Sequence, residues 1–135
     1  MNETMVTVVG NVATKPDFRD NGRCPAVRFR LASTVRRYDR ERNLWADGAT
    51  SFYTVWAWRA LAHNLTASVS IGEPLVVHGR LRVQDSEREG QRWTVATIDA
   101  VAVGHDLTRG TSAWVRAASP RAEFGEARPD PVPTG

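Results

Sequence analysis

The sequence has little cysteine and no long apolar run, and each absence excludes a class of protein. Its single cysteine rules out a cysteine-rich zinc site. No apolar stretch approaches the roughly 20 residues that cross a bilayer, and the first residues, MNETMVTVVGNVA, lack the regions of a signal peptide. We therefore expect one cytoplasmic domain with its own core, since 135 residues leave little room for a second domain.

Lysine is almost absent as well, because Lys15 is the only lysine among 18 basic residues. The net charge is only +3, but the stretch from Arg28 to Arg42 holds six arginines against two acidic residues and is +4. Arginine binds phosphate through two parallel hydrogen bonds and stacks on bases, which favours nucleic acid as a partner. Codon usage in a G+C-rich genome explains the arginine-to-lysine ratio equally well, so the clustering of the charges is the more informative observation.

The motifs of common enzymes are also missing. His63, His78 and His105 do not stand at metal-ligand spacing, and GNVATKP lacks the ending of a phosphate-binding loop. The carboxylates are scattered, mostly beside arginines, unlike those of a two-metal nuclease centre. We expect a protein that is not an enzyme and holds neither a cofactor nor a metal.

Alternating apolar residues predict an all-β domain with one short helix. The expected strands are 5–13, 27–34, 51–59, 74–83 and 91–104. Leu61, Leu65 and Val69 recur at helical spacing, so we predict a helix over 59–70 that Gly72 ends. This order of three strands, a helix and two strands is that of a five-stranded OB-fold Greek-key β-barrel.

The connections between these strands differ in composition. Residues 36–50 are polar and contain Asp47-Gly48, which indicates a long β-hairpin arm, and residues 85–90, DSEREG, indicate a charged loop. We assign residues 1–109 to the OB domain and 110–119 to one extra strand. Residues 120–135 hold four prolines and few large apolar groups, which is typical of a disordered tail.

The third strand is rich in aromatic residues on one face. Because successive strand side chains point to opposite faces, Phe52, Thr54, Trp56 and Trp58 share one face, opposite Val55 and its neighbours. Exposed rings invite aggregation unless something flat stacks on them, as unpaired bases do. The alternative is that some rings pack in a sheet or subunit interface, and for Trp56 both interpretations stay open.

Arginines and further rings surround this strand in the sequence. Cations that neutralise phosphates and rings that hold bases are together what a single-strand groove needs. The predicted arm at 36–50 also carries Trp45 and Arg42 among its rings and cations. The residues we predict to bind DNA are Arg28, Arg30, Arg36, Arg37, Tyr38, Arg40, Phe52, Thr54, Trp56, Trp58, Arg80, Arg82, Arg88, Arg92 and Trp93.

Cys24 has two interpretations. A lone cysteine in the cytoplasm is most often reduced and partly buried. In a symmetric oligomer, Cys24 could instead meet its copy across a two-fold axis and form an intersubunit disulfide.

The chain resembles the bacterial single-stranded DNA-binding protein family from about Thr4 to Leu107. The segments that carry the resemblance are VTVVGNVATKPDFR, AVRFRLASTVRRYDR, TSFYTVWAWRALAHNL and IGEPLVVHGRLRV. It implies an OB fold that assembles as a homotetramer and wraps single-stranded DNA without sequence choice. Such proteins serve replication, recombination, repair or chromosome maintenance in the nucleoid.

By position, the resemblance places the family's stacking rings at Phe52, at Trp58 and at or beside Tyr38. TSAWVRA is similar to the extra strand with which some members clamp neighbouring subunits. Family members usually end in an acidic segment closed by a proline and an aromatic residue, whereas this chain ends RPDPVPTG. We therefore expect a specialised paralogue that does not recruit enzymes through its tail.

Two other functions remain open at this point. An RNA-binding or primosome-type OB protein would use the same face, because stacking and phosphate contacts do not separate DNA from RNA. A protein-interaction module would use the aromatic stripe as an interface and would lack salt-sensitive nucleic-acid binding.

Overall fold

The strands form one sheet that closes on itself into a barrel. Within the described residues, 3–20 and 22–118, the computed structural model contains six strands and one helix; the side chains of 35–37 and 46–47 are not described. The elements are β1 (Thr4–Val12), β2 (Asp17–Arg19), β3 (Ala26–Asp39), β4 (Leu44–Trp58), α1 (Arg59–Ser68), β5 (Pro74–Arg88) and β6 (Gln91–His105). The strand order is β1-β5-β6-β4-β3-β2, and β1 also pairs with β3 through Asn11 and Val12. This closure confirms the predicted OB fold.

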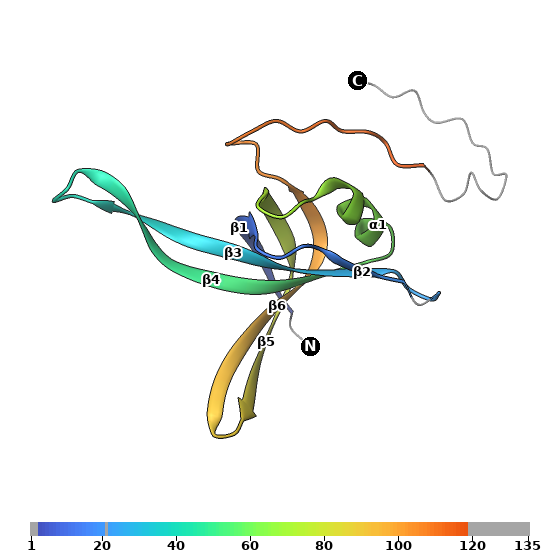
Figure 1. Cartoon of the computed structure of the whole chain (residues 1–135), viewed down its shortest axis with the longest axis horizontal. Helices are drawn as coiled ribbons and strands as arrows, with labels where there is room; N and C mark the ends of the chain where they lie inside the picture. The colour runs from blue at the N-terminus through green and yellow to red at the C-terminus, as the bar shows by residue number, and fades with distance from the viewer. Residues whose placement is uncertain (1–2, 21, 119–135) are drawn as a thin grey trace.

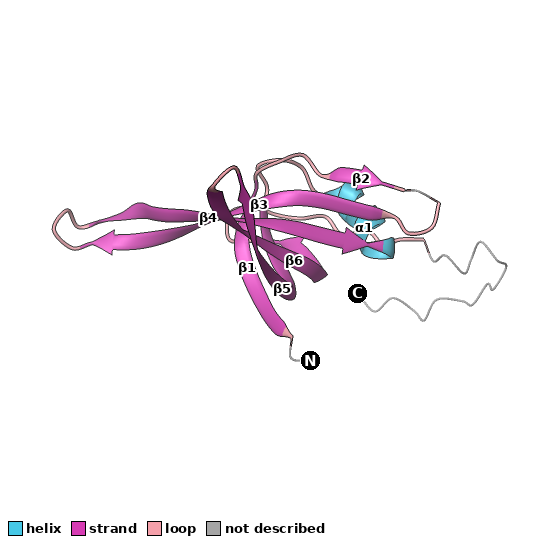
Figure 2. Ribbon diagram, turned by 90° about the horizontal axis from the view of Figure 1, so that it is seen from below, coloured by secondary structure: helices cyan, strands magenta, loops and turns pink. Residues whose placement is uncertain are grey.

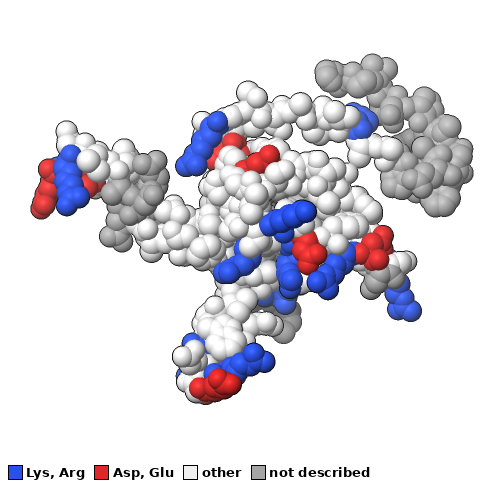
Figure 3. Space-filling view, in the orientation of Figure 1, with Lys and Arg blue, Asp and Glu red and all other residues white. Residues whose placement is uncertain are grey.

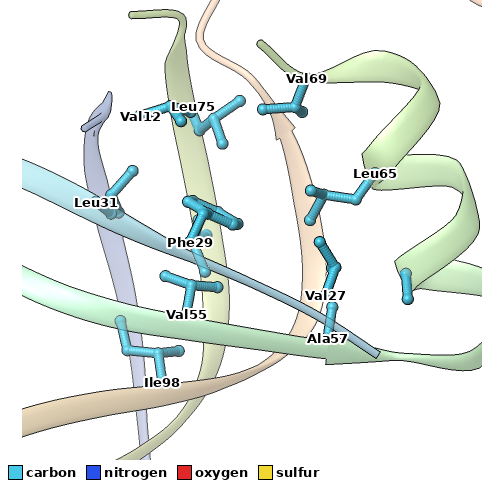
Figure 4. Packing of buried hydrophobic residues seen from close by; sticks show 12 residues of the cluster. Val12, Val27, Phe29, Leu31, Val55, Ala57, Leu65, Val69, Leu75 and Ile98 are labelled. Carbon is cyan, nitrogen blue, oxygen red and sulfur yellow. The ribbon is translucent and has the colours of Figure 1, made fainter. Parts of the chain in front are cut away.

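The core lies inside the barrel and is made of alternate residues from each strand (Figure 4). Val27, Phe29 and Leu31 of β3 are almost fully buried, as the alternation in the sequence predicts. On β4 the buried residues are Val55 and Ala57, and Tyr53 of the same face packs against the core, so Phe52, Trp56 and Trp58 lie on the outer face. The core is completed by Val12, Leu75, Val77, Ile98, Ala62 and Leu65 of α1, and Val69 just after the helix.

Helix α1 covers one open end of the barrel. It lies at the β2 end of the sheet, opposite the β3–β4 arm (Figure 2). Leu65 and Val69 are buried in the core, and Leu61 packs against it, as predicted from their spacing. The helix ends at Ser68, two residues before the predicted end, and Gly72 takes a positive φ of 90° in the turn that follows.

Two hairpin arms leave the barrel in different directions (Figure 1). The first joins β3 and β4 and confirms the predicted arm, although β3 runs five residues further than expected, to Asp39. The second joins β5 and β6 and corrects the predicted loop at 85–90. There both strands continue to a tight turn at Glu89 and Gly90, whose φ angles are 54° and 81°. Two left-handed residues match the twist of paired strands, and the sequence reading missed this turn.

A further correction concerns residues 14–25, which hold a strand that is not among the five expected ones. Asp17, Phe18 and Arg19 form the short strand β2, because they pair with Arg28, Val27 and Ala26 of β3. Phe18 packs against the core and lies 5.0 Å from the ring of His63 on α1.

Gly79 marks a close approach between β5 and β6. The pairing register shifts between His78 and Gly79, and a Cβ at Gly79 would collide with the backbone of Asp99 and Ala100. Only glycine fits there.

The described residues beyond β6, from 107 to 118, are exposed. Residues 106–118 have no strand assignment, so the predicted extra strand at 110–119 does not pair within the described residues. Trp114 and Val115 of this segment are largely exposed. The predicted tail at 120–135 lies outside the described residues. No helix in the described part of the chain is long and apolar enough to cross a membrane.

Candidate nucleic-acid interface

The outer face of β3 and β4 brings arginines onto aromatic rings. Arg28 pairs with Trp56 in the sheet register, and its guanidinium carbon lies 5.5 Å from the centre of that ring. Two residues along β3, the guanidinium carbon of Arg30 lies 4.7 Å from the centre of the Phe52 ring. Both contacts have the geometry of a cation–π interaction. The structure therefore unites the two predicted groups, cations and rings, on one surface.

The rings of β4 form a row along this face. Trp56 and Trp58 are stacked, with centroids 6.1 Å apart and an angle of 9° between their planes. Phe52 and Trp58 are 48% and 36% exposed, whereas Trp56 is half-buried between Arg28 and Trp58. Strand parity was thus read correctly, and Trp56 lies on the outer face within the protomer. We call Phe52, Trp56 and Trp58 the aromatic row.

A hollow of about 330 Å³ adjoins the aromatic row. Its lining carries three cations and one carboxylate, and Asp17 lies 3.8 Å from Arg28. The backbone N–H of Arg30 donates to the hydroxyl of Thr14, which holds the turn after β1 against β3. Sequence reasoning missed Lys15 here, since no local pattern shows that this turn lies beside β3. The lining residues are Thr14, Lys15, Asp17, Arg28, Phe29, Arg30 and Thr54.

The β3–β4 arm carries a second pair of rings. Tyr38 and Trp45 meet edge to face with centroids 5.4 Å apart, and the Tyr38 hydroxyl donates to the side-chain oxygen of Asn43. Arg42 lies 3.8 Å from Asp39, and Arg40 is exposed in the turn. The backbones of Arg36 and Arg37 pair with β4, but their side chains lie outside the described residues.

Arg80 and Arg82 form an ion-pair cluster around Asp99. Arg82 donates to both carboxylate oxygens of Asp99, from Nε at 2.8 Å and from Nη2 at 3.0 Å. Arg80 donates from Nη2 to Asp99 at 2.8 Å and from Nη1 to Glu3 at 3.0 Å. Arg80 and Arg82, which were predicted to bind DNA, are therefore already paired with carboxylates in the protomer. The sequence did not indicate these ion pairs.

The protonation of Asp99 reflects this environment. Asp99 is only 8% exposed, and burial on its own would raise the pKa of its carboxyl group. The hydrogen bonds and charges of Arg82 and Arg80 outweigh that effect, so the pKa of Asp99 lies below its ordinary value. The hydrogen bond from Arg80 to Asp99, and then that to Glu3, raise the pKa of Arg80 above its ordinary value.

The β5–β6 arm holds the remaining predicted residues. Trp93 is 44% exposed and pairs with Ser86, while Arg92 pairs with Glu87. Arg88 is exposed beside the turn. Trp93 has the same strand parity as Asp99, so this arm continues the outer face that carries the aromatic row.

Basic side chains gather over the middle of the sheet, while the tips of both arms carry charges of both signs (Figure 3). Among the described residues, no three His, Cys, Asp or Glu side chains are grouped to hold a metal ion.

Cys24 is half-buried just before β3, and its thiol lies 3.9 Å from the carbonyl oxygen of Pro25. Because the chain has a single cysteine, a disulfide could form only between chains.

The chain is similar to known proteins that share one name. Residues 1–106 match the model of the single-strand binding protein family. "Single-stranded DNA-binding protein 1" of Streptomyces coelicolor is 56% identical over 138 residues, which cover 100% of this chain and 88% of that protein. "Single-stranded DNA-binding protein 2" of Streptomyces avermitilis is 58% identical over 134 residues, which cover 97% of this chain and 85% of that protein.

A solved structure shares the fold as well as the sequence. The crystal structure of a small single-stranded DNA-binding protein from Streptomyces coelicolor superposes with a TM-score of 0.75 at 58% identity. The match covers 82% of this chain and 100% of that one. The family match spans every strand of the barrel and the helix, so this chain belongs to the single-strand binding protein family.

Proposed function

We propose that this protein binds and protects single-stranded DNA without sequence choice. The observation that carries the proposal is the aromatic row with Arg28 and Arg30 lying on its rings. A flat, cationic, aromatic surface suits unpaired bases and their phosphates, and it offers no base-edge readout of sequence. The name shared by the relatives from two Streptomyces species supports the same ligand.

The mechanism is sequestration. The bases stack on the aromatic row, each stack contributing about 1–3 kcal/mol, while arginines replace the counterions of the phosphates. Duplex DNA is disfavoured because its paired bases cannot reach the rings. No bond is made or broken, so we infer a binding protein rather than an enzyme, acting on DNA in the cytoplasm during replication, recombination, repair or chromosome maintenance.

We further propose that four chains assemble. Residues Thr4 to Gly10 of β1 pair with β5 alone in the described protomer, which leaves one edge of that strand open to another chain. The apolar side chains of Met5, Val9 and Val101 are exposed nearby on β1 and β6. Open edges and exposed apolar residues favour association. Light scattering on the purified protein should give a tetramer mass, and a monomer mass would contradict this proposal.

In the proposed assembly, Cys24 is either a reduced thiol or part of an intersubunit disulfide. Non-reducing gel electrophoresis after mild oxidation distinguishes the two interpretations. A dimer band that Cys24→Ser abolishes indicates an intersubunit disulfide, and a band that stays monomeric indicates a reduced thiol.

The test of the function is tryptophan fluorescence with poly-dT, poly-rU and a duplex at low and high salt. We expect strong quenching by poly-dT, weaker quenching by poly-rU and almost none by the duplex, with affinity falling as salt rises. Tighter binding of poly-rU would instead favour an RNA-binding OB protein. Absence of quenching by any of the three would reassign the aromatic row to a protein interface.

A further inference from the structure

We propose that Arg80 and Arg82, held in place by Asp99, form a binding site for a phosphate of the DNA backbone, and that the Glu3 carboxylate occupies this site in the free protein. The proposal rests on the proposed function, since it names a further ligand contact of the same face.

The cluster lies beside the aromatic row. β4 and β6 run parallel here, and their register pairs Trp56 with Asp99. Paired residues of neighbouring strands project from the same face of a sheet. A strand whose base stacks on Trp56 therefore brings its phosphates near the two arginines that Asp99 holds.

Asp99 fixes both guanidinium groups. It receives three hydrogen bonds of 2.8–3.0 Å, two from Arg82 and one from Arg80. Arg82 binds it through Nε and Nη2, and none of the described residues accepts a hydrogen bond from its Nη1. A planar guanidinium held along one edge presents its other nitrogens in a defined direction, which reduces the entropy lost on binding an anion.

Glu3 shows where an anion sits on this cluster. Its carboxylate accepts a hydrogen bond of 3.0 Å from Nη1 of Arg80, the nitrogen not used by Asp99. The side chain of Glu3 is 56% exposed, so water and DNA can reach the contact. Two arginines against two carboxylates give no net charge, whereas the same cluster without Glu3 carries +1. A phosphate that displaces Glu3 meets that charge.

The experiment measures poly-dT affinity by tryptophan quenching for the full-length protein and four variants. They are Glu3→Gln, Arg80→Gln, the double variant, and Asp106→Asn as a matched control. Asp106→Asn, like Glu3→Gln, replaces a carboxylate by its amide and so removes one negative charge. Asp106 lies outside the cluster, seven residues beyond Asp99, where its side chain accepts a hydrogen bond from the Thr108 N–H.

We expect Glu3→Gln to bind about 2- to 5-fold more tightly, the range of an exposed ion pair removed as competitor. Arg80→Gln should weaken binding and make the slope of log K against log salt shallower by about 0.7, one phosphate contact on a single strand. In the Arg80→Gln background, Glu3→Gln should have no effect.

Three results would overturn the inference: an equal gain from Glu3→Gln in both backgrounds, an equal gain from Asp106→Asn, or an unchanged salt slope in Arg80→Gln. The first two would mean that only overall charge changed. Failure of the proposed function gives a different result, because the unmodified protein would then show no quenching by poly-dT. Circular dichroism of each variant excludes misfolding as the cause of a weakened affinity.

Discussion

The guanidinium of Arg28 lies over the indole of Trp56, 5.5 Å from the ring centre, at directly paired positions of β3 and β4. The contact means that one face of this ring has a cationic partner before any nucleic acid arrives. A base that stacks on Trp56 must share the ring with Arg28 or move it aside, and in either case the cation stays close to the incoming phosphate.

Trp56→Ala should weaken binding to poly-dT about 5- to 150-fold, which corresponds to the loss of one stack of about 1–3 kcal/mol. The measurement is a fluorescence polarisation titration with labelled oligo-dT, which does not depend on the remaining tryptophans. Trp114→Ala is the control, because Trp114 is exposed on the segment after β6 and is not one of the rings of the aromatic row. Equal losses in both variants would remove Trp56 from the interface.

We predict that Arg30 contributes both charge and stacking to DNA binding, and two substitutions separate these contributions. Arg30→Lys keeps the charge but loses the planar group that lies 4.7 Å from the Phe52 ring centre, so we expect weaker binding with an unchanged salt slope. Arg30→Gln should also make that slope shallower by about 0.7. A lysine variant that binds as tightly as the unmodified protein would show that charge alone matters at this position.

Gly79→Ala should lower the free energy of unfolding by about 1–3 kcal/mol, because its new Cβ overlaps the β6 backbone and forces the strands apart. Gly104→Ala is the matched control on β6, where an added Cβ meets nothing within 4 Å. Thermal melts at one protein concentration test this, since the proposed assembly would make the melting temperature concentration-dependent. Equal melting temperatures for the two variants would contradict the close approach.

Asp99 should make the protein sensitive to acid. Its pKa is lowered in the folded state, so its contribution to stability is complete above the ordinary value of 3.8 and is lost as pH falls through the folded value. Glu73 acts in the same direction: the hydrogen bond with His105, and then that from the Ser70 N–H, lower its pKa below 4.5.

Asp99→Asn should therefore lose about 1–3 kcal/mol at pH 7 and show a flatter decline of stability below pH 4 than the unmodified protein. Urea unfolding at pH 7 and pH 3 measures both effects. Parallel pH profiles for the two proteins would mean that the ion pairs with Arg80 and Arg82 contribute nothing to folding.

The parts of this structure that follow from local patterns were predictable from the sequence. Strand alternation placed Phe29 inside and Trp56 outside, and helical spacing identified the buried side of α1, because each signal lies within one element. The turn at Glu89 and Gly90 was missed since acidic residues around a glycine look like a loop. Only their positive φ angles show a two-residue turn.

The contacts of Asp99 could not be read from the sequence. They join β6 to β5, Arg80 in turn bonds to Glu3 before β1, and the geometry depends on which residues of distant strands pair. The sequence reading treated Arg80 and Arg82 as cations available to DNA, and nothing local to them indicates a buried carboxylate between them. Lys15 was overlooked for the same reason, because the pairing of β2 with β3 brings its turn to the hollow.

The two arms begin where the barrel interior ends. None of the described side chains from Ala32 to Phe52, or from Arg82 to Ala96, is buried. Insertions or deletions within the arms would therefore alter how much of a strand one subunit covers without disturbing the packing that keeps the subunit folded. Evolution can then adjust the length of DNA covered and the thermal tolerance of the protein as separate traits.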